Sequence, residues 1–248
     1  MIFYDTSLPF LVFAIIGVIF TGISKSGFAG GAGVVAVPIL ALIIPISHAV
    51  IIMVPLLIVM DIKTIHYFGK DVNKKEVMLI IPAAIIGIII GGILLGNINE
   101  AVLQICFGMI CIIFALWQGL APYFSKFSGA AIFWGTISGI TSTLIHSGGP
   151  PFNIYMISRG LPKQVWLATA GVFFFCMNCL KTIPYMMIGE WSLPMLWTSL
   201  MLIPIALLGA YCGKMAQSFV SEKRFMQICR AFLLLSGSLL IYKGVTIT

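Results

Sequence analysis

Charged residues are scarce in this chain of 248 residues, of which 8% are charged and 60% are hydrophobic. A soluble domain is usually about 25% charged and about 45–50% apolar. The mean hydropathy is +1.13, and no stretch of the sequence is polar enough to form a domain outside a membrane. The composition therefore excludes a soluble fold.

Acidic residues are the rarer charged kind, since 7 Asp and Glu accompany 14 Lys and Arg and leave a formal charge of +7. The basic residues lie mostly in short segments between apolar runs, where they set the orientation of a protein in the membrane. Nucleic-acid binding is therefore a poor interpretation of the charge. The N-terminal residues lack the basic region of a signal peptide, so we expect the first apolar segment to stay in the membrane.

Residues that bind metals are also few. The six cysteines lie in or beside apolar runs, where a cysteine usually behaves as a small hydrophobic residue. Cys176 and Cys179 are one helical turn apart, but no second pair of ligands accompanies them. We expect two core thiols rather than a metal or redox site, and we expect no cofactor.

Apolar residues form ten segments along the chain, and a helix needs about 20 such residues to cross a bilayer. The second and seventh segments are too short to cross, so each should pair with the segment before it as a broken or re-entrant helical hairpin. Three spanning helices follow each hairpin. The ten segments comprise residues 8–24, 33–44, 48–66, 77–95, 101–121, 129–145, 150–158, 164–187, 193–213 and 225–243.

The two halves of the chain resemble each other. A shift of 117 residues places Pro45 on Pro162 and Asp61 on Asn178. Matches in the same order at a nearly constant shift indicate a duplication. We predict a first repeat in residues 1–125 and a second in residues 126–248. A slightly larger shift aligns a proline and two glycines further on, namely Pro82, Gly87 and Gly91 with Pro204, Gly209 and Gly213.

Basic residues predict the orientation of the helices, because lysine and arginine prefer cytoplasmic loops. The segment from Gly96 to Glu100 has none and would be outside. A hairpin returns to the face where it began and three crossings follow it, so the second half must be inverted relative to the first, with both termini outside. The residues that fit this arrangement are Lys63, Lys70, Lys74, Lys75, Lys126, Arg159, Lys163, Lys214, Lys223 and Arg224.

The sequence thus predicts an all-α polytopic membrane protein made of two inverted-topology repeats. Inverted repeats with interrupted helices at equivalent positions are typical of secondary transporters, whose substrate site lies near the membrane midplane. The two interruptions are therefore the candidate substrate-binding segments.

The first interruption extends from Gly22 to Gly33, and its glycines let the backbone leave helical geometry and approach a ligand closely. Free N–H groups at the start of the following half-helix would favour an anion. A lysine near the bilayer centre costs about 2.5–3.5 kcal/mol and usually has a function, although Lys25 could instead extend to the membrane surface. The candidate binding residues here are Ser24, Lys25, Ser26, Gly27, Gly30 and Gly31.

The second interruption extends from Ser138 to Asn153, where Pro150 and Pro151 would end one helix and start the next. Its histidine titrates near physiological pH and could couple proton movement to transport, although a lone histidine in an apolar segment is more often simply hydrogen-bonded. The candidate binding residues here are His146, Ser147, Gly148, Gly149 and Asn153.

Asp61 is the second candidate for proton coupling. It could accept a proton within the membrane, or it could pair with Lys63 or Lys181 at the cytoplasmic edge, which is the interpretation that we favour. The G-x-x-x-G spacings at residues 87–91 and 209–213 let helix backbones pack tightly. They could join the two halves, or join two copies of the chain into a homodimer.

The glycine-rich segment from Gly27 to Pro38, which ends in Val37 and Pro38 and is repeated more weakly in the second half, resembles the TauE/SafE sulfite-exporter family. The resemblance covers essentially the whole chain. It implies a transporter of a small sulfur-containing anion such as sulfite or sulfoacetate, driven by the proton gradient in the cytoplasmic membrane. Residues 150–153 replace a longer glycine run, so the resemblance implies the class of anion rather than one substrate.

Two other functions remain open. A membrane-embedded enzyme could use Ser24 with Lys25, or Ser147 with His146, but sequence neighbours do not usually point at one another. A duplicated architecture also predicts a shared site that an enzyme does not need. A passive anion channel would differ in that its flux would not saturate. We therefore predict a transporter rather than an enzyme, whose partners are a small anion, protons and membrane lipids.

Overall fold

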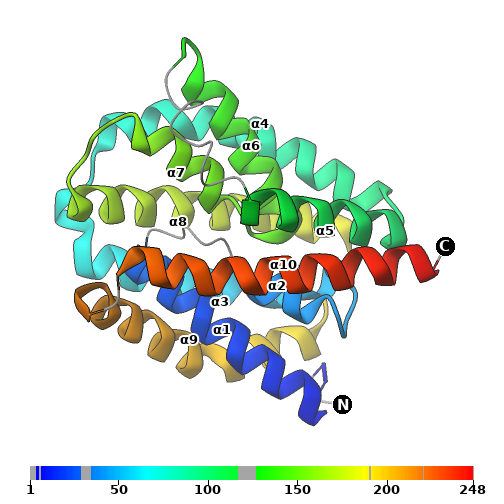
Figure 1. Ribbon diagram of the computed structural model, residues 1–248. Coiled ribbons are helices and arrows are strands. Elements are labelled where there is room, and N and C mark those ends of the chain that lie inside the picture. Colours follow the sequence, from blue (N-terminus) through cyan, green and yellow to red (C-terminus); the bar gives the residue numbers. More distant parts are fainter. Residues whose placement is uncertain are drawn as a thin grey trace.

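The computed structural model describes residues 4–5, 7–28, 35–116, 127–189, 191–219 and 221–247, and these residues form helices without a strand (Figure 1). Each of the ten predicted segments corresponds to one helix, and the two predicted as short are α2, with 5 residues, and α7, with 9. The helices are α1 (Leu8–Phe28), α2 (Ala36–Leu40), α3 (Ile46–Phe68), α4 (Lys74–Asn97), α5 (Glu100–Leu116), α6 (Ala130–Ile145), α7 (Gly149–Ile157), α8 (Lys163–Ile188), α9 (Leu193–Phe219) and α10 (Glu222–Ile247), with the short 3-10 helix η1 (Gly69–Asp71) after α3.

Within the described part of the chain, five helices are long and apolar enough to cross a membrane, namely α1, α3 with η1, α4, α8 and α9. Shorter apolar stretches lie in α5, α6 and α10. Large apolar side chains such as Ile86, Leu208 and Leu235 are exposed on these helices, where lipid chains would cover them. The protein is therefore a multi-pass membrane protein. In the first hairpin, α1 is itself of spanning length and only α2 is short.

Helix α9 is longer than its apolar pattern predicts, because it continues beyond residue 213 to Phe219. The added turns contain Lys214 and Gln217, which are good helix formers that an apolar criterion leaves out. Lys214 is exposed, and its Nζ lies 4.4 Å from the centre of the Tyr67 ring. The helix therefore extends past the apolar layer.

Equivalent prolines begin the two long central helices. Pro45 precedes α3 with φ −54° and ψ 145°, and Pro162 precedes α8 with φ −55° and ψ 148°. Because the proline ring fixes φ, each helix starts from an extended residue of defined direction. The two helices α3 and α8 thus start from the same backbone geometry.

Helices from the two halves pack against each other in equivalent pairs. Helix α1 packs against α9 through Gly22 and Gly209, and α6 packs against α4 through Gly139 and Gly87. A Cβ atom on Gly22 would lie 2.7 Å from the carbonyl carbon of Gly209, so larger residues would force these helices apart. Gly22 and Gly139 are 117 residues apart and Gly87 and Gly209 are 122 apart, so each helix pair joins residues that the sequence comparison aligns. Helices α3 and α8 also contact each other, and α5 packs against α10.

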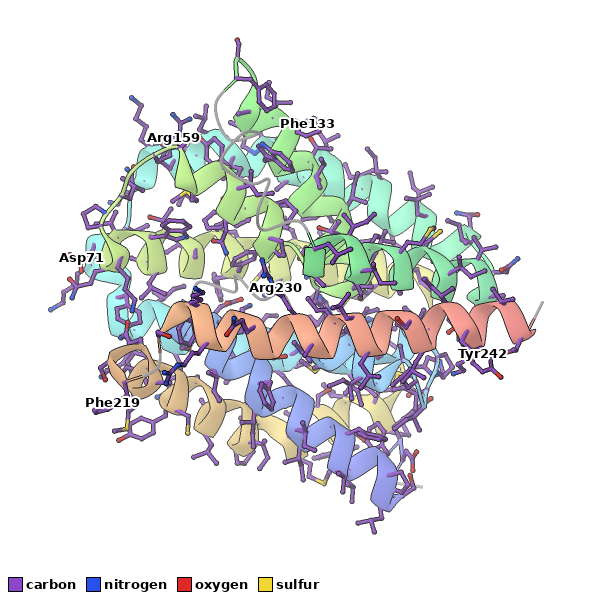
Figure 2. All side chains as sticks on the ribbon, viewed as in Figure 1. Asp71, Phe133, Arg159, Phe219, Arg230 and Tyr242 are labelled. Carbon is purple, nitrogen blue, oxygen red and sulfur yellow. The ribbon has the colours of Figure 1, made fainter. Side chains whose placement is uncertain are left out.

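The two ends of the helix bundle differ in charge. Both termini lie at one end in Figure 1, whereas Asp71, Arg159 and Phe219 lie at the opposite end in Figure 2. Lys243 lies near the C-terminus, where its Nζ donates to the carbonyl oxygens of Ala41 and Leu42 at 3.3 and 3.5 Å. Most basic residues lie in the connections, or in the helix starts beside them, at the end opposite the termini. They include Lys70, Lys74, Lys75, Arg159, Lys163, Lys223 and Arg224.

Candidate functional site

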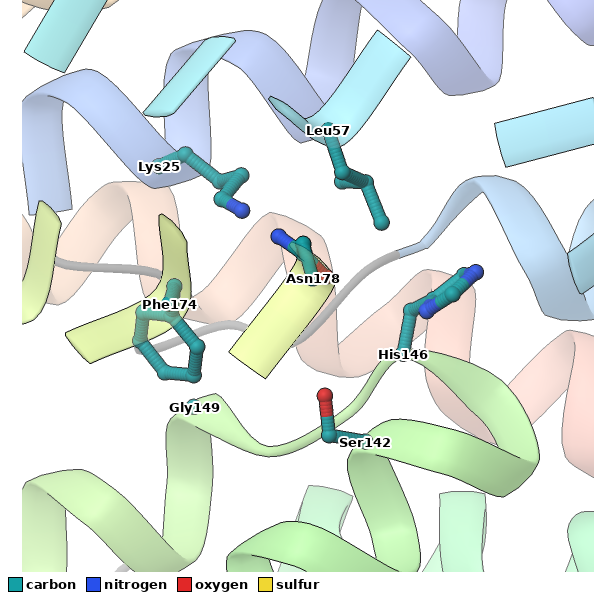
Figure 3. Close-up of a pocket in the computed structure, with 7 residues that line it drawn as sticks. All are labelled: Lys25, Leu57, Ser142, His146, Gly149, Phe174 and Asn178. Carbon is teal, nitrogen blue, oxygen red and sulfur yellow. The ribbon is translucent and has the colours of Figure 1, made fainter. Parts of the chain in front are cut away.

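A small cavity lies where both hairpins meet the central helices. Its volume is about 10 Å³, and Figure 3 shows its lining side chains converging from five helices and their ends. Both halves of the chain contribute to it. The lining residues are Lys25 on α1, Leu57 on α3, Ser142 on α6, His146 after α6, Gly149 on α7, and Phe174 and Asn178 on α8.

A buried ion pair lies beside this cavity. Lys25 is in the last turn of α1, and its Nζ is 2.6 Å from Oδ1 of Asp61 on α3; the two side chains are 6% and 1% exposed. The other carboxylate oxygen of Asp61 accepts a hydrogen bond from Nδ2 of Asn178 at 2.5 Å. Nζ of Lys25 also lies 5.4 Å from the centre of the Phe174 ring, within the range of a cation–π interaction. Both carboxylate oxygens of Asp61 are therefore held by a donor.

This geometry corrects two interpretations of the sequence. Lys25 does not extend to the membrane surface, because its ammonium group is buried against Asp61. Asp61 is not anchored by Lys63 or Lys181 at the cytoplasmic edge, because its ion pair is with Lys25 in the interior. The helices α1 and α3 meet at this point, and a sequence alone does not show which lysine faces the carboxylate.

A second buried lysine contacts two of the residues that line the cavity. Nζ of Lys181 on α8 donates to the carbonyl oxygen of Ser142 at 3.1 Å, to the Ser142 hydroxyl at 2.9 Å and to Nδ1 of His146 at 2.7 Å. An ammonium group has three N–H donors, and each has an acceptor here. Nε2 of His146 lies 2.8 Å from the carbonyl oxygen of Val50, and this bond assigns the ring proton to Nε2. Sequence reasoning did not include Lys181, Ser142 or Asn178 among the site residues.

The second interruption is a tight turn built by hydroxyl groups. Helix α6 ends at His146, whose φ of 56° lies in the left-handed region. The Ser138 hydroxyl donates to the carbonyl oxygen of Gly148 at 2.7 Å, and the Thr141 hydroxyl donates to that of Ser147 at 3.1 Å. A Cβ atom on Gly148 would lie 2.8 Å from Cβ of Ser142, so the turn needs glycine there. The predicted break between two helices is confirmed, and it holds His146 at the cavity.

The other candidates of the first interruption serve packing more than binding. The hydroxyl of Ser26 lies 2.9 Å from that of Thr64, and Ser24 is fully buried. Gly27 packs against Gly213, since a Cβ atom on it would lie 2.6 Å from the Gly213 carbonyl oxygen. Gly30 and Gly31 lie outside the described residues.

The remaining candidates of the second interruption divide in the same way. Gly149 lines the cavity, and Gly148 belongs to the turn beside it. Ser147 is 1% exposed, and its hydroxyl has no hydrogen-bond partner within the described part of the chain. Asn153 does not join the cavity, because its Oδ1 accepts a hydrogen bond from Nε1 of Trp166 at 2.9 Å.

The charges of the site are unequal. Two lysines and one aspartate are buried together, so the cluster carries a formal excess of one positive charge. The shift of 117 residues relates Lys25 to Ser142 and Asp61 to Asn178, so the second half has a neutral pair where the first has an ion pair. Burying charge is expensive unless it is paired. The excess charge therefore favours the binding of an anion.

The cysteines do not form a metal centre in the described residues. Cys176 and Cys179 are partly exposed on α8 rather than buried core thiols, and no group of three His, Cys, Asp or Glu residues there could hold a metal ion.

Comparison with known proteins identifies the family. The family model described as Sulfite exporter TauE/SafE matches residues 13–240, which is nearly the whole chain. A search of curated proteins found no match, and a search of solved structures found none either. The chain therefore belongs to the TauE/SafE sulfite exporter family, a family of membrane transporters of sulfur-containing anions.

Proposed function

We propose that this protein is a proton-coupled secondary transporter that carries a small sulfur-containing anion, such as sulfite or sulfoacetate, across the cytoplasmic membrane. The observation that carries the proposal is the buried cluster of Lys25, Lys181 and Asp61, which has an excess positive charge at a cavity formed by both halves. Ser142, Asn178 and the start of α7 at Gly149 supply further donors toward the same cavity.

The direction of equivalent helices supports inverted repeats in residues 1–125 and 126–248. In Figure 1, α4 begins at the end opposite the termini, whereas its equivalent α9 begins at the end that holds the termini. The central pair α3 and α8 also run in opposite directions. With most basic residues inside, both termini would be outside. Two inverted halves around one site suit alternating access.

The size of the cavity favours a transporter over an open channel. A volume of about 10 Å³ is roughly that needed to hold one water molecule. An oxyanion with several heavy atoms needs more room, so the helices around Lys25 and His146 must separate to admit it. The proposed cycle opens the site toward one side of the membrane at a time.

Transport by the purified protein tests this function. Proteoliposomes should take up or release sulfite or sulfoacetate with saturable kinetics, and an imposed pH gradient should change the rate. The proposal would be abandoned if no sulfur oxyanion moved faster than in liposomes without protein. Flux that increases linearly with anion concentration and ignores the pH gradient would support a channel instead.

Lys25 should contribute directly to anion binding. We expect Lys25→Ala to raise the Kd for sulfite about tenfold or more, since a hydrogen bond to a charged group contributes about 1.5–3 kcal/mol. Lys75→Ala is the matched control, because Lys75 is exposed at the start of α4 and does not line the cavity. Sulfite titration calorimetry on both variants provides the measurement. Equal effects of the two substitutions would remove Lys25 from the site.

A further inference from the structure

The carboxylate of Asp61 binds two side chains that an anion in the cavity would also contact. Lys25 and Asn178 both line the cavity, and both now bind Asp61, which does not line it. We propose that Asp61 is a built-in counter-ion, which the transported anion displaces from Lys25 and which accepts a proton when displaced, so that the anion and the proton cross the membrane together. This inference rests on the proposed transport function.

Charge balance within the buried cluster gives the first argument. With Asp61 ionised and both lysines protonated, Lys25 and Lys181 leave one positive charge unbalanced, which one monoanion would neutralise. A dianion would leave the cluster with an excess negative charge unless Asp61 took up one proton. Because an unbalanced buried charge is expensive, binding of a dianion favours protonation of Asp61. The ion pair with Lys25 then breaks, the proton bonds to a carboxylate oxygen, and it returns to water when the anion leaves.

The second half of the chain shows that the fold accepts a neutral group at this position. Asn178 is the repeat equivalent of Asp61, and it has the shape of a protonated aspartate with an N–H group in place of the O–H group. The same shift relates Lys25 to Ser142. Asn178 thus resembles the state that Asp61 would adopt after protonation.

The groups that face Asp61 leave it as the proton acceptor of the cluster. Lys25 approaches it from α1, and Asn178 and Lys181 approach it from α8. The thiols of Cys176 and Cys179 on α8 also interact electrostatically with Asp61. His146 is already bonded at both ring nitrogens, to Val50 and to Lys181. A second ring proton, on Nδ1, would point at the ammonium group of Lys181.

This arrangement favours movement of the proton and the anion in the same direction across the membrane. Protonation of Asp61 frees Lys25 for the anion, so proton and anion binding help each other rather than compete. The affinity for a dianion should therefore rise as the pH falls, by up to about tenfold per pH unit for one linked proton. An exchanger that carries a proton one way and an anion the other would need the two to exclude each other.

The substitution Asp61→Asn tests the inference in the full-length protein. In proteoliposomes at mildly alkaline pH, where sulfite is mostly a dianion, sulfite movement by the wild type should carry about one proton per anion in the same direction. D61N should move sulfite without this proton, and its affinity for the sulfite dianion should no longer depend on pH. Subtracting the proton movement of D61N from that of the wild type removes the protons that sulfite itself binds or releases, because these are the same for both proteins. Glu76→Gln is the matched control, because Glu76 is a buried carboxylate bonded to Tyr155 and Arg159 and should leave proton movement intact.

Each outcome separates this inference from the proposed function. Absence of sulfur-anion transport by the wild type would overturn the function itself. Transport by the wild type together with unchanged proton movement in D61N would overturn the role of Asp61 alone. If D61N does not fold, proton uptake on sulfite binding to the detergent-solubilised wild type decides the matter: about one proton per sulfite beyond a protein-free blank supports the role, and none overturns it.

Discussion

Lys25 and Asp61 stabilise each other as an ion pair in the interior of the protein. Both side chains are almost fully buried, and their ion pair is 2.6 Å long. Removing one member of a buried ion pair typically costs about 3–5 kcal/mol, since the other is left as an unpaired charge, whereas replacing both by neutral groups is often tolerated. The stability of the fold and the binding of an anion therefore depend on the same two residues.

A double-mutant cycle measures this dependence. Lys25→Met should lower the apparent Tm of the detergent-solubilised protein strongly, because Asp61 loses its counter-ion. The double variant with Lys25→Met and Asp61→Asn should regain most of the loss, with an interaction energy of about 2–3 kcal/mol between the two sites. Thermal unfolding of the two single variants and the double variant gives the result. Additive effects would contradict a direct interaction between these side chains.

Part of the candidate site could be predicted at this scale. Lys25, Asp61 and His146 are ionisable residues in apolar segments, which is itself a sign of function. Lys181 was treated only as a neighbour of Asp61, although its spacing of three residues from Asn178 places both on one face of α8. The bond between Asn153 and Trp166 could not be predicted, because these partners are brought together only when α7 and α8 are folded.

Close helix crossings control the packing of the central elements. Gly87 on α4 faces Gly139 on α6, and a Cβ atom on Gly87 would lie 2.8 Å from Cα of Gly139. Backbone atoms cannot move aside as a side chain can, so α6 would have to shift as a whole. Since α6 ends at His146, this crossing also sets the position of the cavity wall.

Alanine at this crossing should therefore destabilise the protein and disturb the site. We expect Gly87→Ala to cost about 1–3 kcal/mol, as overpacking of an interior usually does. Gly96→Ala in the same helix is the control, because its Cβ atom would lie 3.6 Å from Ile188, an ordinary contact, and alanine is the better helix former. Thermal unfolding and sulfite binding of both variants are the measurements. A smaller loss for G87A than for G96A would contradict the crossing geometry.

The elements themselves were largely predictable, but their contacts were not. Hydropathy and the prolines at residues 45 and 162 fix where α3 and α8 begin. At the end of the bundle opposite the termini, however, the Tyr155 hydroxyl on α7 donates to the carboxylate of Glu76 on α4. Nε of Arg159, just after α7, lies 3.2 Å from the same carboxylate. These partners are far apart in sequence, and no local pattern relates them.

At the scale of the whole molecule, the two halves interlock rather than stand side by side. Helix α1 of the first half packs against α9 of the second, and α6 of the second packs against α4 of the first. The sequence shift predicts that such contacts come in pairs, because a contact between two helices recurs between their equivalents. It does not predict that they cross between the halves, since that depends on the relative direction of the repeats.

The orientation of the repeats gives the last prediction. Lys75 and Asn97 lie near opposite ends of α4, and Ser192 and Lys223 lie just beyond opposite ends of α9. If most basic residues face the cytoplasm, a membrane-impermeant maleimide applied to intact cells should label Asn97→Cys and Ser192→Cys in a cysteine-free background. Lys75→Cys and Lys223→Cys should react only after the membrane is permeabilised. Because α4 begins inside and its equivalent α9 begins outside, this pattern is what inverted repeats require. Parallel repeats would instead place the starts of the two helices, and therefore Lys75→Cys and Ser192→Cys, on the same side.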